Sequence, residues 1–256
     1  MNRSLKFRLT RRHFLAFSAV APLASHVGLG HAQSCPVTDP IISNPAIGGH
    51  GIGLDFLGKS SATVQTNSFT SGAGSIILAS VGRGTLADFA RATVSDNKGN
   101  GNYAQIGIAH AYTNYNSSGT ALYAKVAAAG GAGHIVSTTK PSASDEVTVI
   151  VAEFKNVTTI VDSKWVEDLT SPNTSARVTT TGPAILAAFW WGDDGNGELN
   201  PAVDAGWTVL DHTASLASNH VQSASAYKVV AGAGTYSINW TPSTAQGAQL
   251  WIVAMQ

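Results

Sequence analysis

The sequence predicts an all-β protein, a jelly-roll β-sandwich built from two related halves with little helix. Three observations support this prediction. Apolar residues recur at the two-residue period of strands, glycine-rich turn signals separate these runs, and blocks of the first half recur in the second. Only 12% of the residues are charged, and no segment keeps amphipathic helical spacing over several turns, so long helices are not expected.

Residues 1–32 are predicted to be an export signal and not part of the fold. Several basic residues precede an apolar run at 14–24, which is shorter than the roughly 20 residues of a transmembrane helix. Arg11 and Arg12, followed by Phe14 and Leu15, are typical of a twin-arginine signal peptide, with an ordinary secretory signal as the alternative. We therefore expect the protein to be periplasmic or secreted.

Cleavage after this segment changes the charge of the chain. It removes five of the 15 basic residues and none of the 15 acidic ones, which leaves ten against 15, a net charge of −5. A mildly acidic surface argues against nucleic acid as a partner, and no later stretch is apolar enough to be transmembrane. The single Cys35 can form no internal disulfide. An unmodified Cys35 in an exported tail is favoured over a lipid-modified one.

Residues 33–49 contain three prolines and are predicted to be a linker or extended arm. Residues 50–256 are predicted to form a single β-sandwich domain, with repeated halves at about 62–154 and 175–256. Strands are expected near 51–57, 62–69, 74–82, 91–95, 103–110, 121–128, 133–138, 146–154, 158–165, 175–180, 184–191, 206–211, 221–230, 235–241 and 248–255.

Self-comparison supports the two halves. The matching blocks are 70–82 with 180–192, 121–130 with 225–234, and 149–152 with 251–254. This alignment predicts that Tyr123 and Tyr227 occupy equivalent positions. One jelly roll made of two Greek keys is favoured over two separate small sandwiches, because it leaves fewer strand edges to protect.

Four segments carry a resemblance to a known group of proteins. They are 93–100 (TVSDNKGN), 123–130 (YAKVAAAG), 151–157 (VAEFKNV) and 234–241 (GTYSINWT). Together they resemble jelly-roll modules of bacterial exported and phage-tail-like proteins. The resemblance covers about residues 50–256 and implies a concanavalin-like or carbohydrate-binding-module-like sandwich. It implies no catalytic residues.

The loop after the apolar strand at 184–191 is the first candidate site. It is acidic and rich in glycine, and its earlier counterpart is shorter. Flexible clusters of carboxylate and amide oxygens are the ligands that calcium prefers, although the spacing is not that of an EF-hand. The candidate metal ligands are Asp193, Asp194, Glu198 and Asp204. A solvated polar turn without metal is the favoured alternative, so calcium is a candidate and no cofactor is certain.

The tryptophans beside this loop are the second candidate. Neighbouring residues of a strand point to opposite faces, so one of Trp190 and Trp191 is expected to be buried and the other is a candidate for exposure. An exposed indole beside carboxylates and amides suits sugar binding. The candidate ligand-binding residues are Trp190, Trp191, Trp207, Asn196 and Asn200.

These features favour an exported, non-enzymatic protein that binds a glycan or another cell-surface partner through the loop after 184–191. Two alternatives remain open. One is a structural, self-assembling envelope or tail-like protein, which includes a homo-oligomer. The other is a glycoside-active hydrolase with Glu153 as its acid, although a structural Glu153 at a strand end is favoured. No nucleophile elbow, metalloprotease motif or phosphate loop occurs in the sequence.

Overall fold

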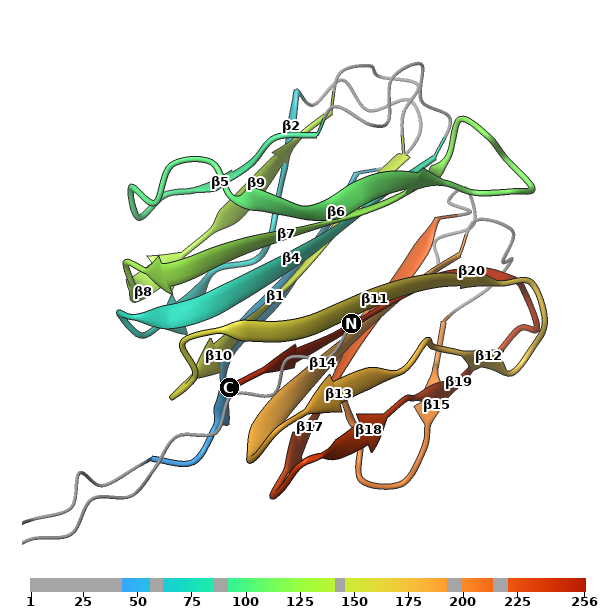
Figure 1. The fold of residues 1–256 in the computed structure, drawn as a ribbon. Coiled ribbons are helices and arrows are strands. Elements are labelled where there is room, and N and C mark those ends of the chain that lie inside the picture. Colours follow the sequence, from blue (N-terminus) through green and yellow to red (C-terminus); the bar gives the residue numbers. More distant parts are fainter. Residues whose placement is uncertain (1–42, 56–61, 85–91, 141–145, 193–198, 214–220) are drawn as a thin grey trace, which may run out of the picture. The chain divides into compact units, whose positions relative to one another are not determined.

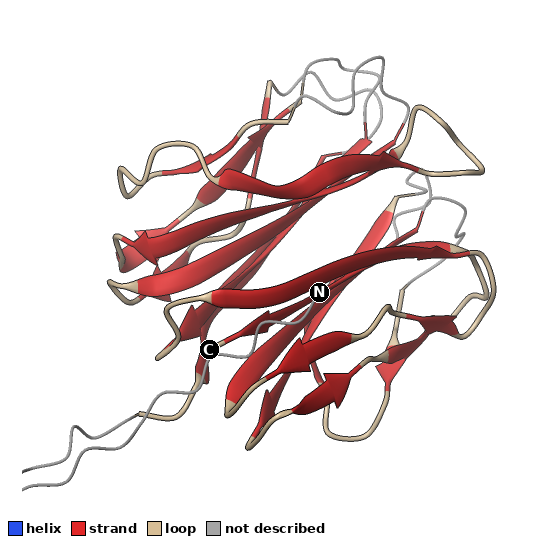
Figure 2. Cartoon of the chain, in the orientation of Figure 1, coloured by secondary structure: helices blue, strands red, loops and turns tan. Residues whose placement is uncertain are grey.

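The computed structural model describes residues 43–55, 62–84, 92–140, 146–192, 199–213 and 221–256, all within one compact unit that begins at Ile42. These residues form twenty strands and no helix (Figure 1), and Figure 2 shows the same arrangement coloured by secondary structure. The all-β prediction is therefore confirmed. Within the same ranges, no helix is long and apolar enough to cross a membrane. The predicted signal peptide and Cys35 lie outside the described residues.

Ten strands belong to the first half. They are β1 (Ala46–Asp55), β2 (Thr63–Gln65), β3 (Phe69–Ser71), β4 (Ser75–Gly84), β5 (Val94–Asp96), β6 (Ala104–Ala111), β7 (Gly119–Ala128), β8 (Gly131–His134), β9 (Val136–Thr139) and β10 (Glu146–Lys155). The large sheet has the order β1-β10-β4-β7-β6. Two small sheets, β2-β9-β5 and β3-β8, form the other layer.

The second half has the same series of strands. They are β11 (Ile160–Asp168), β12 (Asn173–Thr174), β13 (Val178–Thr180), β14 (Ala184–Gly192), β15 (Ala202–Val203), β16 (Thr208–His212), β17 (Gln222–Val230), β18 (Gly234–Tyr236), β19 (Asn239–Thr241) and β20 (Ala248–Met255). The large sheet is β11-β20-β14-β17-β16, and the small ones are β12-β19-β15 and β13-β18. Adding ten to each strand number of the first half reproduces the strand order of the second.

The strand order within each half is that of a jelly roll, in which the chain wraps back and forth between two antiparallel layers. Every ladder between described strands joins strands of the same half. The predicted all-β sandwich of two related halves is confirmed. The jelly-roll order occurs once in each half, so the preference for one jelly roll made of two Greek keys is wrong, and the alternative of two small sandwiches agrees with the strand order. Part of this order lies in strands of two to four residues, too short to stand out as periodic runs.

Three buried clusters hold the layers together. One fills the first half and includes Val81, Tyr123 and Val149, and one fills the second half and includes Trp190 and Trp240. The third lies between the two large sheets (Figure 1), where Leu78, Ile150 and Phe154 meet Phe189, Trp251 and Val253. Central strands β4 and β14 are therefore buried on both faces, which explains their continuous apolar sequence.

The structural repeat is offset by one position from the repeat read in the sequence. Strand β13 starts 109 positions after β3 (Val178 against Phe69), and β14 starts 109 positions after β4 (Ala184 against Ser75). The alignment of the sequence blocks, 70–82 with 180–192, instead has an offset of 110 positions and places Ala188 opposite Leu78. A shift of one position reverses the faces of a strand. Leu78 accordingly lies between the large sheets, whereas Ala188 lies in the core of its own half.

The predicted equivalence of Tyr123 and Tyr227 is wrong for this reason. Tyr123 pairs with Ala79, and the residue 109 positions after Ala79 is Ala188, which pairs with Ala226. Tyr123 packs inside the first half, while Tyr227 lies against the cluster between the sheets. The Tyr123 hydroxyl does donate a hydrogen bond, to the Ala92 carbonyl at 3.1 Å, as expected for a buried tyrosine.

The two large sheets meet through contacts related by a pseudo-twofold axis. Thr148 pairs with Gly82, and its equivalent Gln249 pairs with Trp191. Across the interface the hydroxyls of Thr148 and Ser223 lie 2.6 Å apart, and the Thr120 hydroxyl donates to Gln249 Oε1 at 2.9 Å. Thr120 and Ser223 are themselves equivalent, so these two hydrogen bonds are copies of each other. This is the isologous pattern of a symmetric dimer, formed within one chain.

Candidate functional site

The acidic loop predicted to bind calcium falls mostly on residues that the structure does not describe. Asp193, Asp194, Asn196 and Glu198 lie outside the described ranges. Within them, no group of three or more histidine, cysteine or acidic residues is arranged to hold a metal ion. Calcium binding therefore stays a prediction.

The two described members of that loop have local hydrogen bonds. The Asp204 carboxylate accepts from the backbone N–H of Asn239 at 2.8 Å and from its side-chain amide at 3.2 Å. The exposed Asn200 donates its backbone N–H to the Ser243 hydroxyl at 3.1 Å. The two hydrogen bonds tie Asp204 to strand β19, so the role that the structure shows for this carboxylate is a local structural one.

The expected exposed tryptophan is not found among Trp190, Trp191 and Trp207. Their exposed fractions are 1%, 1% and 7%. Trp190 points into the core of the second half and donates its indole N–H to Asn173 Oδ1 at 2.8 Å. The neighbouring Trp191 points the opposite way, but that face is covered by the first half, because the large sheets pack against each other. Core packing therefore accounts for both indoles, and neither offers a ring face to a sugar.

An exposed aromatic residue does lie where β14 ends. Trp191 contacts the buried Tyr112 edge-on, with ring centroids 5.6 Å apart, and Tyr112 contacts Tyr115 at 6.2 Å. Tyr115 is 49% exposed. Gly192, the last residue of β14, is the neighbour of Trp191 in sequence, so this strand ends close to the two tyrosines.

The loop that carries Tyr115 is tied down at several points. Its backbone closes through hydrogen bonds from Tyr115 N to Tyr112 O and from Ser118 N to Tyr115 O. Glu167 on β11 accepts from the backbone of Thr113 at 3.0 Å. The side chains around Tyr115 are exposed amides and hydroxyls, from Thr113, Asn114, Asn116 and Ser117. We call residues 113–117 the Tyr115 loop.

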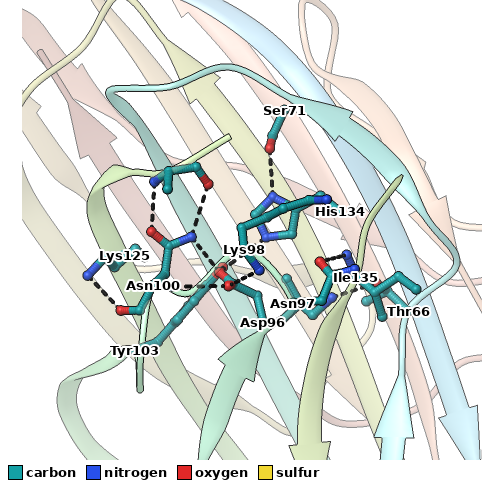
Figure 3. Close-up of polar contacts among 12 residues, drawn as sticks. Thr66, Ser71, Asp96, Asn97, Lys98, Asn100, Tyr103, Lys125, His134 and Ile135 are labelled. Atoms are coloured by element: carbon teal, nitrogen blue, oxygen red, sulfur yellow. Dashed lines mark hydrogen bonds and ion pairs between the residues drawn. The ribbon is translucent and has the colours of Figure 1, made fainter. Parts of the chain in front are cut away.

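A second polar cluster lies at the opposite end of the first half's strands (Figure 3). His134 on β8 is fully buried, and its Nδ1 lies 2.6 Å from the hydroxyl of Ser71 on β3. Its Nε2 lies 3.1 Å from Asp96 Oδ2, close enough for an ion pair but without the alignment of a hydrogen bond. The Phe69 ring stacks on the imidazole with centroids 4.9 Å apart.

Asp96 holds the loop that follows β5. Its carboxylate accepts from the backbone of Lys98 at 2.8 Å, from the Asn100 amide at 2.6 Å and from the Tyr103 hydroxyl at 2.8 Å. Burial alone would raise the pKa of Asp96, but these hydrogen bonds together lower it below its ordinary value. Burial, with the bond to Asp96 as the second cause, raises the pKa of Tyr103. Asp96 is therefore ionised, and the hydrogen bonds that its carboxylate accepts hold this loop in place.

Serine, histidine and aspartate in contact are also the components of a nucleophilic triad. Whether the cluster is catalytic or structural depends on whether a substrate can reach the serine and on whether free N–H donors are present to form an oxyanion hole. His134 is 0% exposed and Ser71 is 6% exposed. The nearest following backbone donor, Gly72 N, is already bonded to Glu153 Oε1 at 2.5 Å. A substrate would find neither the serine nor a free donor here, so the cluster acts as a structural clamp.

Glu153, the residue considered as a hydrolase acid, is the second clamp on the same turn. It is 1% exposed, and its other oxygen accepts from Gly49 N at 2.8 Å. Its contacts with backbone N–H groups of β1 and of the β3–β4 turn agree with the structural alternative.

Sequence reasoning missed both the Ser71–His134–Asp96 cluster and the Tyr115 loop. The three clamp residues are separated by 25 and 38 positions, so no local motif joins them. Alignment of the halves in the correct register places His134 opposite Tyr236, so it marks His134 as a difference between the halves but does not identify its partners. Comparison with protein families finds no matching model, and comparisons with curated proteins and with solved structures find no match either.

Proposed function

We propose that this chain is an exported, non-enzymatic binding protein that recognises a glycan or another cell-surface partner. The export part of the proposal rests on residues 1–32, and the binding part on the Tyr115 loop. The observation that carries it is the half-exposed ring of Tyr115 close to the end of strand β14.

The chemistry of this surface suits a polyhydroxylated ligand. A tyrosine ring offers a flat apolar face for the C–H side of a sugar, and its hydroxyl can exchange hydrogen bonds. Asn114 and Asn116, which are the sequence neighbours of Tyr115, supply exposed amide donors and acceptors, and the Asn114 amide also donates to the Tyr112 hydroxyl at 3.3 Å. Leu169, 48% exposed, adds apolar surface nearby, since Gly247 lies between it and the Tyr112 hydroxyl. Tyr115 thus takes the role that the sequence suggests for Trp190 or Trp191.

The anchoring of the loop supports binding without rearrangement. Backbone hydrogen bonds join Tyr112, Tyr115 and Ser118, and the Glu167 contact ties Thr113 to β11. A side chain that is already ordered loses less entropy on binding. The absence of an accessible nucleophile or carboxylate pair in the two polar clusters described above favours binding over catalysis.

The test is a glycan array followed by calorimetry with the glycan that gives the strongest signal, using the mature chain. Tyr115→Ala is expected to lower affinity at least tenfold. The matched control is Val126→Ala, which shortens a similarly exposed side chain (45%) at the other end of β7. Binding that survives Tyr115→Ala, or no binding to any glycan, contradicts the proposal. A mass that rises with concentration in sedimentation, without ligand, would favour the self-assembling alternative instead.

A further inference from the structure

A shallow pocket of about 280 Å³ lies at the end of the first half opposite the Tyr115 loop. Its walls are the β3–β4 turn, residues 72–75, and the segment 155–158 that joins the two halves. Val157 closes its floor, being 2% exposed. The volume is close to the lower limit of about 300 Å³ for small-molecule sites, so it suits a single ring and not a long chain.

Two buried clamps fix one wall of this pocket. Glu153 accepts from Gly72 N on one side of the turn, and His134 holds the preceding residue, Ser71, on the other. Ser75 adds a hydrogen bond from its hydroxyl to the Gly72 carbonyl at 2.9 Å. Burying ionisable groups costs free energy unless they are satisfied by partners. Side-chain hydrogen bonds of Glu153, His134 and Ser75 thus hold the β3–β4 turn in addition to its backbone hydrogen bonds.

The second half shows that the fold does not need these clamps. Glu153 pairs with Ile77, and 109 positions later Leu186 pairs with Ala254, so a buried alanine takes the place of the glutamate. By the pairing given above, Tyr236 takes the place of His134. The same strand order forms in the second half without a buried carboxylate or imidazole at these positions. Glu153 and His134 are therefore not required for the strand order, and they fix the conformation of the β3–β4 turn.

The opposite wall of the pocket, residues 155–158, carries a positive charge. Lys155 is exposed and is the one charged residue among the described residues that line the pocket. Asn156 beside it has a positive φ of 61° and donates its side-chain amide to the Asn44 carbonyl at 2.8 Å, so this wall is also fixed. Thr158 places an exposed hydroxyl at the end of the wall.

The pseudo-twofold axis provides a natural comparison. The corresponding pocket of the second half, about 240 Å³, lies between Pro183, which is 109 positions after Gly74, and the segment leading into β1. None of its lining residues is charged, and most are apolar: Pro45, Pro183, Val229, Val230 and Ala231. The lysine is therefore a feature of one pocket and not of the repeat.

We infer that the pocket formed by residues 72–75 and 155–158 binds the carboxylate-bearing ring of a sugar acid. Lys155 attracts the carboxylate as a point charge, and Thr158 and the turn backbone exchange hydrogen bonds with ring hydroxyls. The Glu153 carboxylate does not compete with the ligand's carboxylate for Lys155, because it is buried beneath the turn and accepts hydrogen bonds from backbone N–H groups. The choice of a sugar acid rests on the proposed glycan-binding function, but the site is distinct from the Tyr115 loop.

The experiment is an NMR or calorimetric titration of the mature chain with galacturonate, glucuronate, galactose and acetate. We expect a uronate to bind, galactose to bind at least tenfold more weakly, and added salt to weaken uronate binding. Lys155→Gln should remove uronate binding. The control is Lys164→Gln, since Lys164 is an exposed lysine already 2.7 Å from Asp162 and outside the pocket.

Each outcome decides between the alternatives. No binding of either uronate, equal binding of galactose, or unchanged affinity in Lys155→Gln overturns the inference. Binding of acetate as strong as that of the uronates overturns the sugar-acid assignment. Tyr115→Ala separates this inference from the proposed function. If this variant still binds the uronate but no longer binds the glycan array, the protein has two separate sites. If Tyr115→Ala abolishes uronate binding and Lys155→Gln does not, the pocket beside Lys155 is not the uronate site.

Discussion

The indole of Trp191 occupies the space that a side chain at Gly82 would fill. A Cβ built on Gly82 would overlap Cδ1 and Nε1 of that ring. Gly82 and Trp191 are equivalent residues of the two halves, 109 positions apart, so their contact lies on the pseudo-twofold axis. One half contributes the largest side chain and the other contributes none, which lets the two sheets approach at this point.

Gly82→Ala tests this contact. Neither the central strand nor the ring has room to move, so we expect a loss of about 1–3 kcal/mol in the free energy of unfolding, as for other overpacked cores. Chemical denaturation measures it. Gly232→Ala is the control, because no atom lies within 4 Å of a Cβ placed on that glycine. Equal stability of Gly82→Ala and the unmodified protein would contradict the contact.

Glu153→Gln tests the clamp on the β3–β4 turn. A carboxylate accepts from both Gly72 N and Gly49 N, whereas a glutamine turns one NH₂ group toward a backbone donor. One buried N–H then loses its acceptor, at a cost of about 1–3 kcal/mol. The readouts are the denaturation midpoint and faster amide exchange at Gly72 or Gly49. A variant with unchanged midpoint and exchange would show that the carboxylate is dispensable.

Asp96 gives the fold a stability that depends on acid. Its folded-state pKa is lowered, so the ionised carboxylate stabilises the folded state at any pH above the unfolded value of about 3.9. That contribution is lost as the pH falls through the lowered folded-state pKa. We expect Asp96→Asn to lower the melting temperature at pH 7 and to flatten its decline below pH 4. A decline as steep in Asp96→Asn as in the parent would assign the acid sensitivity to other carboxylates.

His110 connects pH to the interface between the halves. Its ring stacks on Trp165 at 3.7 Å and lies 5.3 Å from Trp251, and burial lowers its pKa, an effect that Glu167 partly opposes. The folded state then binds fewer protons than the unfolded state, so stability is fully present above about pH 6.5 and falls below it. His110→Phe keeps an aromatic ring and should remove this part of the decline between pH 7 and 5. An unchanged profile would exclude His110 as its source.

The fold class was predictable from sequence because alternating apolar runs and glycine-rich turns are local signals. The register was not. Strands β4 and β14 are apolar on both faces, so Leu78 matches Ala188 as well as it matches Ala187, and only packing distinguishes the two alignments. The same cause made Trp191 a candidate for exposure, since nothing in its own strand shows that a second sheet covers it.

The candidate sites were less predictable than the fold. Tyr115 stands in a polar loop without apolar periodicity. Its position near the end of β14 depends on the contact between Tyr112 and Trp191, two residues that are distant in sequence. Glu153 was visible as a carboxylate at a strand end, but its two backbone partners, Gly49 and Gly72, come from other parts of the chain. Roles of this kind follow from tertiary packing and not from local pattern.

Two jelly rolls pack sheet to sheet in the register that brings Gly82 against Trp191, its equivalent residue 109 positions later. Disulfide trapping tests this packing directly, in a Cys35→Ser background. The Thr148 and Ser223 hydroxyls lie 2.6 Å apart across the interface, so Thr148→Cys combined with Ser223→Cys should form a disulfide on mild oxidation, detected by mass spectrometry. Thr148→Cys combined with Ala224→Cys should not, because Ala224 faces the core of its own half. A disulfide in the second pair and none in the first would contradict this account.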